Sequence, residues 1–530
     1  MMKKGKTLLA VLLMLISVVA SASVKIVPEP VEIHEYSGKF TLPSEVTISD
    51  FRDGKMVDTY IELSSKILKT KGVALKKGGK NSTVKLSISK KIKGEGEYII
   101  EVGKRDIRIQ AADEDALWCG LQTLTQLLSQ GVDRQMVIRD EPRFGYRGAM
   151  LDCCRHFFSV EDVKSFIDMM AVHKLNRFHW HLTEDQGWRI EIKKYPRLTE
   201  IGSVRESTYM TNYSGEQCDS FVDKPYGGFY TQDDIREIVK YAHDRHIVTI
   251  PEIEIPGHSV AALASYPWLG CTGGPYKVRV KWGISEDVMC IGKETTWQFI
   301  RDVLDEVCQL FPGELIHIGG DETPRKKWSE CPDCQALMKK EGMTEEAQLQ
   351  SWITTKVENY LETKGKRIIG WDEVLEGGVS TKCVVMSWLK GSVGGQKAAG
   401  FGNDVIMTDK YHCYFDCYQT DTREGELFAH KRNIPLEKVW NYNPIGGMDD
   451  ASASHVLGVQ CNTWTEHISS MDRVYFMNLP RMAALAEVAW STPASLSGYQ
   501  DFLQRLQSSL IPIYQAAGWN FAEFYKKDIK

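Results

Sequence analysis

The sequence predicts an α/β fold in which a (β/α)8 TIM barrel catalytic domain follows a small α+β domain. After residue 144, eight short apolar segments alternate with longer amphipathic ones, whereas residues 24–143 contain clustered strand patterns and a helix. Polar and aromatic residues also gather directly after the apolar segments. Eight parallel strand–helix units close into a barrel with its active site at the carboxyl ends of the strands.

Residues 1–22 have the features of a signal peptide. Three lysines within residues 1–6 precede an apolar run over residues 7–19, and Ala20-Ser21-Ala22 has the small-x-small form of a cleavage site. An uncleaved membrane anchor is the alternative, but the run is short for a bilayer span. We expect an exported protein that is periplasmic, at the cell surface or secreted, with no membrane span after cleavage.

The net charge of the chain indicates which classes of binding partner it suits. Loss of the leader removes three lysines and changes the formal charge from -5 to -8. Such a chain offers no basic field for nucleic acid or anionic lipid, and a neutral substrate suits it. Roughly 500 mature residues allow two or three domains. Exposed barrel helices could also support a homodimer.

The small domain is expected to end near residue 143. Residues 83–89, 97–102 and 106–111 have strand patterns, and residues 113–130 have an amphipathic helical pattern. Three acidic residues open this helix and suit its amino-terminal dipole. Residues 140–143 are polar and contain a proline, which favours a domain boundary.

Residues 144–530 are expected to form the barrel and a C-terminal helix. The eight expected strands cover residues 147–153, 177–182, 247–254, 314–318, 367–371, 383–388, 404–408 and 457–464. Expected helices between them cover residues 160–173, 233–245, 297–310 and 347–364. Residues 411–454 are less regular and are expected to form a long loop over the catalytic face.

The stretch HIGGDETP at residues 317–324 places two adjacent carboxylates after a strand. In an extended segment Asp321 and Glu322 would point to opposite faces, so one would act directly and its neighbour indirectly. The two preceding glycines permit a sharp turn and leave room for a ligand. A carboxyl crowded by another tends to keep its proton, as a general acid requires.

Other strand ends add aromatic rings, carboxylates and an arginine. Tryptophan faces pack on the apolar faces of sugar rings, and charged groups bind sugar hydroxyls, so this composition is typical of a carbohydrate site. The residues at these ends are Arg155, His156, Glu184, Asp185, His258, Trp371, Asp372, Trp388, Asp416, Trp464 and Glu466.

Five ordered motifs resemble those of family 20 glycoside hydrolases, the β-N-acetylhexosaminidases. They are RGAMLDCCRHFF at 147–158, TEDQGWR at 183–189, PEIEIPGH at 251–258, the HIGGDE stretch, and WTE at 464–466. LWCGLQTL at 117–124 also resembles a helix of the family's small amino-terminal domain. The resemblance covers nearly the whole mature chain.

This resemblance implies exo-acting, retaining hydrolysis of terminal non-reducing β-linked N-acetylglucosamine, N-acetylgalactosamine or both. The substrate's acetamido oxygen would be the nucleophile and would give an oxazolinium intermediate, with no cofactor or metal. Glu322 would be the acid and base, Asp321 would orient the acetamido group, and His258 with Glu184 would support Glu322. Many relatives carry Asp where this chain has Glu184. Substrate-binding roles would fall to Arg155, Trp371, Trp388, Tyr414, Asp416, Tyr442, Trp464 and Glu466.

Two other functions compete with this interpretation. His179-Trp-His181 could begin the metal site of an amidohydrolase-type barrel enzyme, although core histidines are favoured because the pair lies inside the second strand. A non-catalytic glycan-binding barrel protein would use the same aromatic residues, but it would not need Asp321 and Glu322. Thirteen cysteines form no disulfide framework, and Cys331-Pro-Asp-Cys334 suggests a local disulfide or a free thiol pair rather than a metal site.

Overall fold

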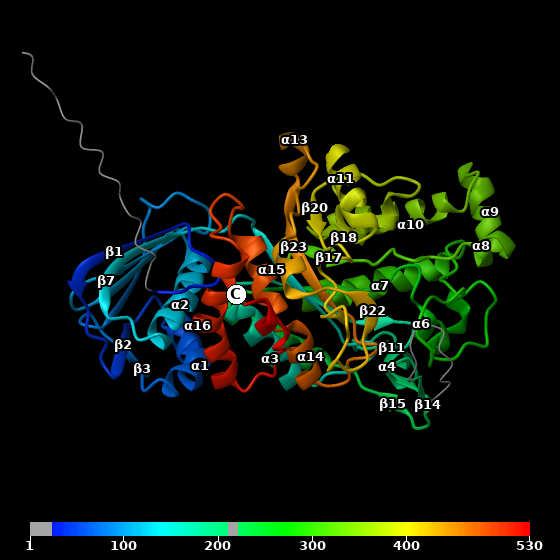
Figure 1. The fold of residues 1–530 in the computed structure, drawn as a ribbon. Coiled ribbons are helices and arrows are strands. Elements are labelled where there is room, and N and C mark those ends of the chain that lie inside the picture. The colour runs from blue at the N-terminus through cyan, green and yellow to red at the C-terminus, as the bar shows by residue number, and fades with distance from the viewer. Residues whose placement is uncertain (1–23, 210–220, 530) are drawn as a thin grey trace, which may run out of the picture.

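The computed structural model describes residues 24–209 and 221–529, and the expected signal peptide lies outside them. Figure 1 shows a small sheet-and-helix domain (blue and cyan) beside a larger barrel (green to orange). None of the described helices has the length and apolar character needed to cross a membrane.

The small domain is a seven-stranded mixed sheet in the order β1-β7-β5-β6-β4-β2-β3. Helices α1 (Lys55–Lys69) and α2 (Glu114–Ser129) pack against it. Asp113 caps α2 by accepting a hydrogen bond from the Ala116 N–H, which agrees with the acidic start expected from the sequence. The strands are β1 (Glu32–Lys39), β2 (Glu45–Ser49), β3 (Ala74–Gly78), β4 (Val84–Ile88), β5 (Tyr98–Val102), β6 (Ile107–Ala111) and β7 (Arg134–Asp140).

The second domain is a closed parallel barrel of eight strands, which confirms the predicted fold class. Each strand overlaps one of the eight predicted segments. They are β8 (Tyr146–Asp152), β9 (Arg177–His181), β16 (Val248–Glu252), β17 (Leu315–His317), β18 (Arg367–Trp371), β19 (Val384–Ser387), β20 (Val405–Met407) and β23 (Val456–Thr463).

Helices surround the barrel, and two of them start at clear sequence signals. Ser159 before α3 (Val160–Val172) and Thr231 before α5 (Gln232–Asp244) each form a capping box with an aspartate three residues on. The other main barrel helices are α7 (Glu294–Leu310), α10 (Ala347–Glu362), α11 (Val393–Gly400), α14 (Met471–Asn478) and α15 (Arg481–Trp490).

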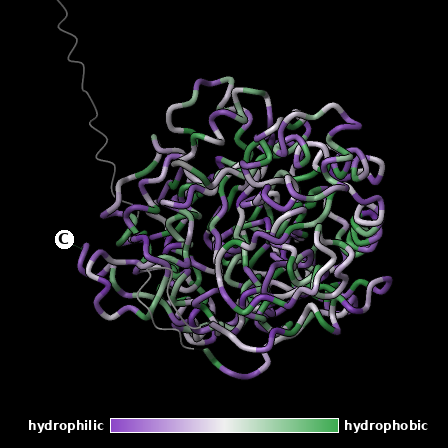
Figure 2. Tube along the Cα trace, turned by 90° about the vertical axis from the view of Figure 1, so that its right-hand side faces the viewer, coloured by the Kyte–Doolittle hydropathy of each residue, from purple (hydrophilic) through white to green (hydrophobic). Residues whose placement is uncertain are grey.

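The last long helix, α16 (Tyr499–Ala517), packs against α1 and α2 of the small domain. In Figure 1 it lies as a red helix at the junction of the two domains. Hydrophobic stretches lie mainly in the interior and hydrophilic ones mainly along the outer loops (Figure 2). The small sheet and the barrel share one continuous apolar core, so the two domains support each other.

The barrel interior holds a second, smaller apolar cluster that includes Trp371, the last residue of β18. Residues 411–454 are more ordered than expected. They contain β21 (Cys417–Tyr418), which pairs with β22 (His430–Asn433), and the short helices α12 (Leu436–Trp440) and α13 (Asp450–Ala453). This segment covers one side of the catalytic face and supplies side chains to it.

Candidate active site

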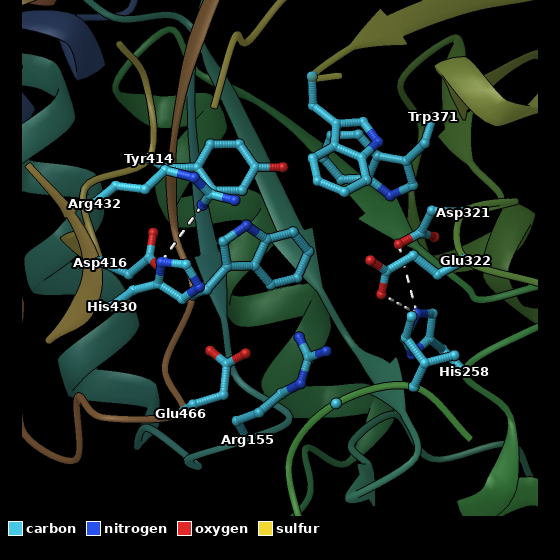
Figure 3. A pocket seen from close by; sticks show the side chains of 14 residues that line it. Arg155, His258, Asp321, Glu322, Trp371, Tyr414, Asp416, His430, Arg432 and Glu466 are labelled. Atoms are coloured by element: carbon cyan, nitrogen blue, oxygen red, sulfur yellow. Dashed lines mark hydrogen bonds and ion pairs between the residues drawn. The ribbon is translucent and has the colours of Figure 1, made fainter. Parts of the chain in front are cut away.

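A pocket of about 320 Å³ opens at the carboxyl ends of the barrel strands. Ten of the twelve predicted site residues line it, and Figure 3 shows their side chains converging from several strand ends. These ten are Arg155, His258, Asp321, Glu322, Trp371, Trp388, Tyr414, Asp416, Trp464 and Glu466.

The acidic pair enters the pocket through a tight turn after β17. Gly319 and Gly320 have φ of 67° and 90°, and Glu322 itself has φ of 41°. The extended backbone expected here is therefore wrong, and both Asp321 and Glu322 face the pocket instead of opposite sides. A non-glycine residue in the left-handed region is strained, which is common at functional sites.

Gly319 is required for a second reason. A Cβ atom at this position would lie 1.8 Å from Oε2 of Glu254, which is buried. Burial raises the pKa of Glu254 well above its usual value, and the carboxylates of Asp321 and Glu252 add to this effect. The turn therefore passes directly over a carboxyl group that favours its neutral form.

A buried row of alternating charges leads to the acidic pair. Arg155 Nη2 lies 2.8 Å from Glu184 Oε2, and Glu184 Oε1 lies 2.7 Å from His258 Nδ1. The other imidazole nitrogen, Nε2, lies 3.6 Å from an oxygen of Asp321 and 3.6 Å from an oxygen of Glu322. The predicted support residues therefore connect Arg155 to both acids.

These contacts set the charges along the row. Burial opposes ionisation of Glu184, but Arg155 and His258 outweigh it and hold the pKa of Glu184 well below its usual value. Burial also disfavours charge on His258, yet Glu184 and Asp321 raise the pKa of this imidazole well above its usual value. His258 is accordingly a cation that donates from Nδ1 to Glu184 and presents Nε2–H to the acids.

Asp321 is the buried member of the pair, with 9% of its surface exposed. Burial raises the pKa of Asp321 to about 6; His258 opposes this effect, and Glu252 and Glu322 add to it. Its Oδ1 atom is buried and has no hydrogen-bond partner within the described part of the chain. A ligand that donates an N–H here would satisfy this oxygen.

Four aromatic rings form the floor and wall of the pocket. Trp371 is buried in the barrel and donates its indole N–H to Glu252 Oε1 at 2.7 Å. Its ring centroid lies 5.9 Å from that of Trp464, and Trp388 stacks on Tyr414 at 6.0 Å with an interplanar angle of 17°. These faces provide the apolar surface that a sugar ring needs.

The side of the pocket opposite the acidic pair is also polar (Figure 3). Burial raises the pKa of Asp416 to about 7, and Glu466 contributes to this shift. Arg432 Nη1 lies 3.4 Å from His430 Nδ1, and both side chains line the pocket. Acceptors and donors therefore face the cavity from both ends.

Two predicted site residues do not line the pocket. Glu184 lies behind it and acts on it through Arg155 and His258. Tyr442 stacks on His412 at 4.7 Å, and its hydroxyl lies 3.2 Å from Ser392 Oγ, so the structure does not bring it to the other ligand-facing residues.

Sequence reasoning missed several residues of the site. Glu373 accepts the indole N–H of Trp388 at 2.9 Å, and burial raises its pKa to about 8, with Asp321 and Asp372 adding to the effect. Its position two residues after Trp371 was an available signal. His430 and Arg432 had no comparable signal, because the pairing of β21 with β22 brings them to the pocket.

His179 and His181 face the barrel interior and both contact Glu252. His179 Nδ1 lies 2.9 Å from the amide nitrogen of Gln460, and Glu252 also accepts from Trp371. These atoms could approach a metal, but each already has a hydrogen-bond partner in the protein. This network supports the pocket floor, as expected for core histidines.

The barrel is closed, and its strand ends carry an acidic pair, a row of charged support residues and an aromatic floor. These are the features of a glycoside hydrolase catalytic domain. The chain belongs to glycosyl hydrolase family 20: the family's catalytic domain matches residues 144–493 and its domain 2 matches residues 23–141.

Individual relatives agree with this assignment. A beta-hexosaminidase of Porphyromonas gingivalis is 42% identical over 92% of this chain and 63% of its own, and one of Vibrio furnissii is 40% identical over 74% and 65%. The chain thus spans less than two thirds of the length of these two relatives. The solved structure of a Vibrio harveyi GH20 exo beta-N-acetylglucosaminidase with N-acetylglucosamine has a TM-score of 0.81 and 31% identity, covering 95% of this chain and 80% of that one.

Proposed function

We propose that this protein is an exo-acting, retaining β-N-acetylhexosaminidase that removes terminal non-reducing β-linked N-acetylglucosamine or N-acetylgalactosamine. The observation that supports this proposal most directly is that Asp321 and Glu322 both face one pocket with an aromatic floor, and that cationic His258 lies beside them. The family and the names of the relatives support the same activity.

The proposed first step uses the substrate's own nucleophile. The acetamido oxygen attacks the anomeric carbon while the bond to the leaving oxygen breaks, and Glu322 gives its proton to that oxygen. Asp321 accepts the acetamido N–H at its unsatisfied oxygen, which holds the nucleophile in place and balances the positive charge of the oxazolinium ring.

In the second step Glu322 takes a proton from water, which attacks the anomeric carbon from the face that the leaving group vacated. The bond between the anomeric carbon and the acetamido oxygen breaks, and the acetamido group is restored. Two inversions give net retention. Glu322 must reach the leaving group and water, and 34% of its side chain is exposed. Only 12% of the Asp321 side chain is exposed, which suits a residue that orients the acetamido group.

Exo action is supported by the shape of the site. A volume of about 320 Å³ is at the small end of ligand pockets, and buried Trp371 closes its floor. One terminal sugar would fill the pocket while the rest of the glycan extends outward.

The test compares aryl β-N-acetylglucosaminide with aryl β-glucoside, using wild type and Glu322→Gln. Only the acetamido sugar supplies a nucleophile, so wild type should cleave it alone, and the variant should lose about 10²–10⁴-fold in kcat. Equal cleavage of both sugars would reject the mechanism. Tight N-acetylglucosamine binding without any turnover would instead favour the glycan-binding protein.

We also propose that the protein is exported and that residues 1–22 are removed, on the basis of the leader's composition. Amino-terminal sequencing of protein from cell fractions tests this. The homodimer remains a proposal as well, to be tested by light scattering on the mature protein.

A further inference from the structure

Four cysteines converge from the segments that follow β16 and β17. Cys290 Sγ lies 3.5 Å from Cys331 Sγ and 3.6 Å from Cys334 Sγ, and Cys271 Sγ lies 4.0 Å from Cys334 Sγ. All four sulfurs lie within 4.8 Å of one another. Cys271 is partly exposed and the other three are buried.

These separations fit a shared metal ion better than disulfides. Tetrahedral zinc thiolate sites have Zn–S distances of about 2.3 Å, so their sulfurs lie about 3.8 Å apart. A disulfide would bring two sulfurs to about 2.05 Å. All twelve cysteines in the described part of the chain are free. We propose that Cys271, Cys290, Cys331 and Cys334 form a structural zinc site.

The backbone positions the four cysteines as two pairs, as in many metal-binding turns. Cys331 precedes α9 (Pro332–Glu341), and Cys334 lies in its first turn. The other two cysteines follow Gly270 and Met289, which form an antiparallel bridge. The proposal departs from the expectation for Cys331 and Cys334, which was a local disulfide or a free thiol pair. The sequence has no second CxxC motif, but the bridge between Gly270 and Met289 supplies the second pair of cysteines.

Gly292 allows the two halves of the site to meet. A Cβ atom there would lie 2.2 Å from the Asp333 carbonyl oxygen and 2.5 Å from the Cys334 nitrogen. The chain after Cys290 therefore passes in close contact over the turn between Cys331 and Cys334. Lys293 donates to the carbonyl of Gly270, so an ammonium group stands beside a site whose four thiolates exceed the charge of one Zn²⁺.

The site joins the two loops that carry the acid–base machinery. Met289 N–H donates to the Pro256 carbonyl at 3.0 Å, close to His258, and Trp328 Nε1 donates to the Met289 carbonyl at 2.9 Å. Trp328 belongs to α8 (Lys326–Glu330), which begins shortly after Glu322. Zinc would therefore clamp the loop after β16 to the segment after β17. It takes no part in the chemistry.

The first test is the zinc content of the full-length protein purified without chelators. We expect about one zinc per chain, with X-ray absorption showing four sulfur neighbours at about 2.3 Å. Each thiol loses a proton on binding, so a strong chelator added under denaturing conditions should expose four more reactive thiols than denaturation without it. Iron in place of zinc, two disulfides by mass spectrometry, or four reduced thiols without metal would each overturn the proposal.

Variants localise the metal. Cys331→Ser/Cys334→Ser should lose the zinc and lower the Tm, whereas Cys308→Ser, a partly buried cysteine of α7 outside the cluster, should keep both. Should the double variant fail to fold, Cys271→Ser removes only the partly exposed ligand and should lower zinc affinity at least tenfold. An unchanged zinc affinity in Cys271→Ser would contradict a four-cysteine site. These readouts do not depend on the proposed activity.

Discussion

His258 Nδ1 lies 2.7 Å from Oε1 of Glu184, and this contact aims the opposite nitrogen of the imidazole at the acidic pair. Glu184 is held ionised by Arg155 on its other side. Because the imidazole is cationic, it favours the ionised form of Asp321, which burial would otherwise keep neutral. The row therefore acts as a fixed positive counter-charge for Asp321.

Replacement of this cation should change the pH dependence of the reaction. In wild type, kcat/KM should rise as Asp321 ionises at about pH 6. His258→Gln removes the group that lowers this pKa, so the acidic limb should move to higher pH by about one unit or more. Full pH profiles of kcat/KM for both proteins give the measurement.

The control for this change is His243→Gln, because His243 is an exposed histidine on α5. Its profile should match wild type. An unmoved acidic limb in His258→Gln would mean that the imidazole is not the counter-charge of Asp321.

Asp321→Asn should make the protein more stable but less active. The folded-state pKa of about 6 exceeds the ordinary 3.8, so the unfolded state loses its proton first as the pH rises. The protonated Asp321 carboxyl therefore contributes to the free energy of unfolding of wild type. This contribution is nearly full below about pH 4 and is lost as the pH rises through 6. Asparagine avoids the loss, so the variant should be more stable at pH 7 by up to about 3 kcal/mol and turn over far more slowly.

Urea unfolding of Asp321→Asn and wild type at pH 7 and at pH 4 measures this effect. The difference between the two proteins should shrink at the lower pH, which lies well below the folded-state pKa of Asp321 and close to its ordinary value in the unfolded state. A stability gain of the same size at both values would show that ionisation of Asp321 is not its source.

Gly319→Ala tests the turn that delivers the acidic pair. Its positive φ costs any non-glycine residue about 1–2 kcal/mol, and its Cβ would also strike Glu254. Gly365→Ala is the matched control, because φ is 71° there and nothing lies within 4 Å of the added Cβ. We expect a modest loss of Tm in Gly365→Ala, and a larger loss together with inactivity in Gly319→Ala. Equal behaviour would mean that the Glu254 contact can relax freely.

The barrel and most of the pocket were predictable because local patterns determine them. Apolar strands, capping residues and polar strand ends are all readable in the sequence, and strand ends of a parallel barrel must converge. The orientation of Asp321 and Glu322 was not predictable in the same way. It depends on two glycines and Glu322 adopting positive φ, which alternation rules for a strand do not anticipate.

Long-range pairing explains the features that the sequence did not indicate. His430 and Arg432 reach the pocket through a strand pair inside a segment that was expected to be a loop. Cys271 and Cys290 join Cys331 and Cys334 through a bridge between distant positions. Neither relation leaves a spacing signal in the sequence, because the partners are brought together only by the tertiary fold.

The junction of the two domains contains a buried ion pair, and loss of one partner should destabilise the protein. Lys174 Nζ lies 3.1 Å from Asp140 Oδ2 and 4.3 Å from the ring centroid of Trp490, and the side chains of the ion pair are fully buried. Asp140 ends β7 of the small sheet, whereas Lys174 precedes β9 of the barrel. Lys174→Met would leave the carboxylate buried without its cation, at a cost of about 3–5 kcal/mol.

Chemical unfolding of Lys174→Met measures that cost, and Lys240→Met is the control. Lys240 makes an exposed pair with Asp244 on α5, which should contribute about 0.5 kcal/mol or less. Adding Asp140→Asn to Lys174→Met removes the unpaired charge and should recover part of the loss, because the penalty comes from the isolated carboxylate. No recovery would show that packing of the lysine stem against Trp490, and not charge, holds the domains together.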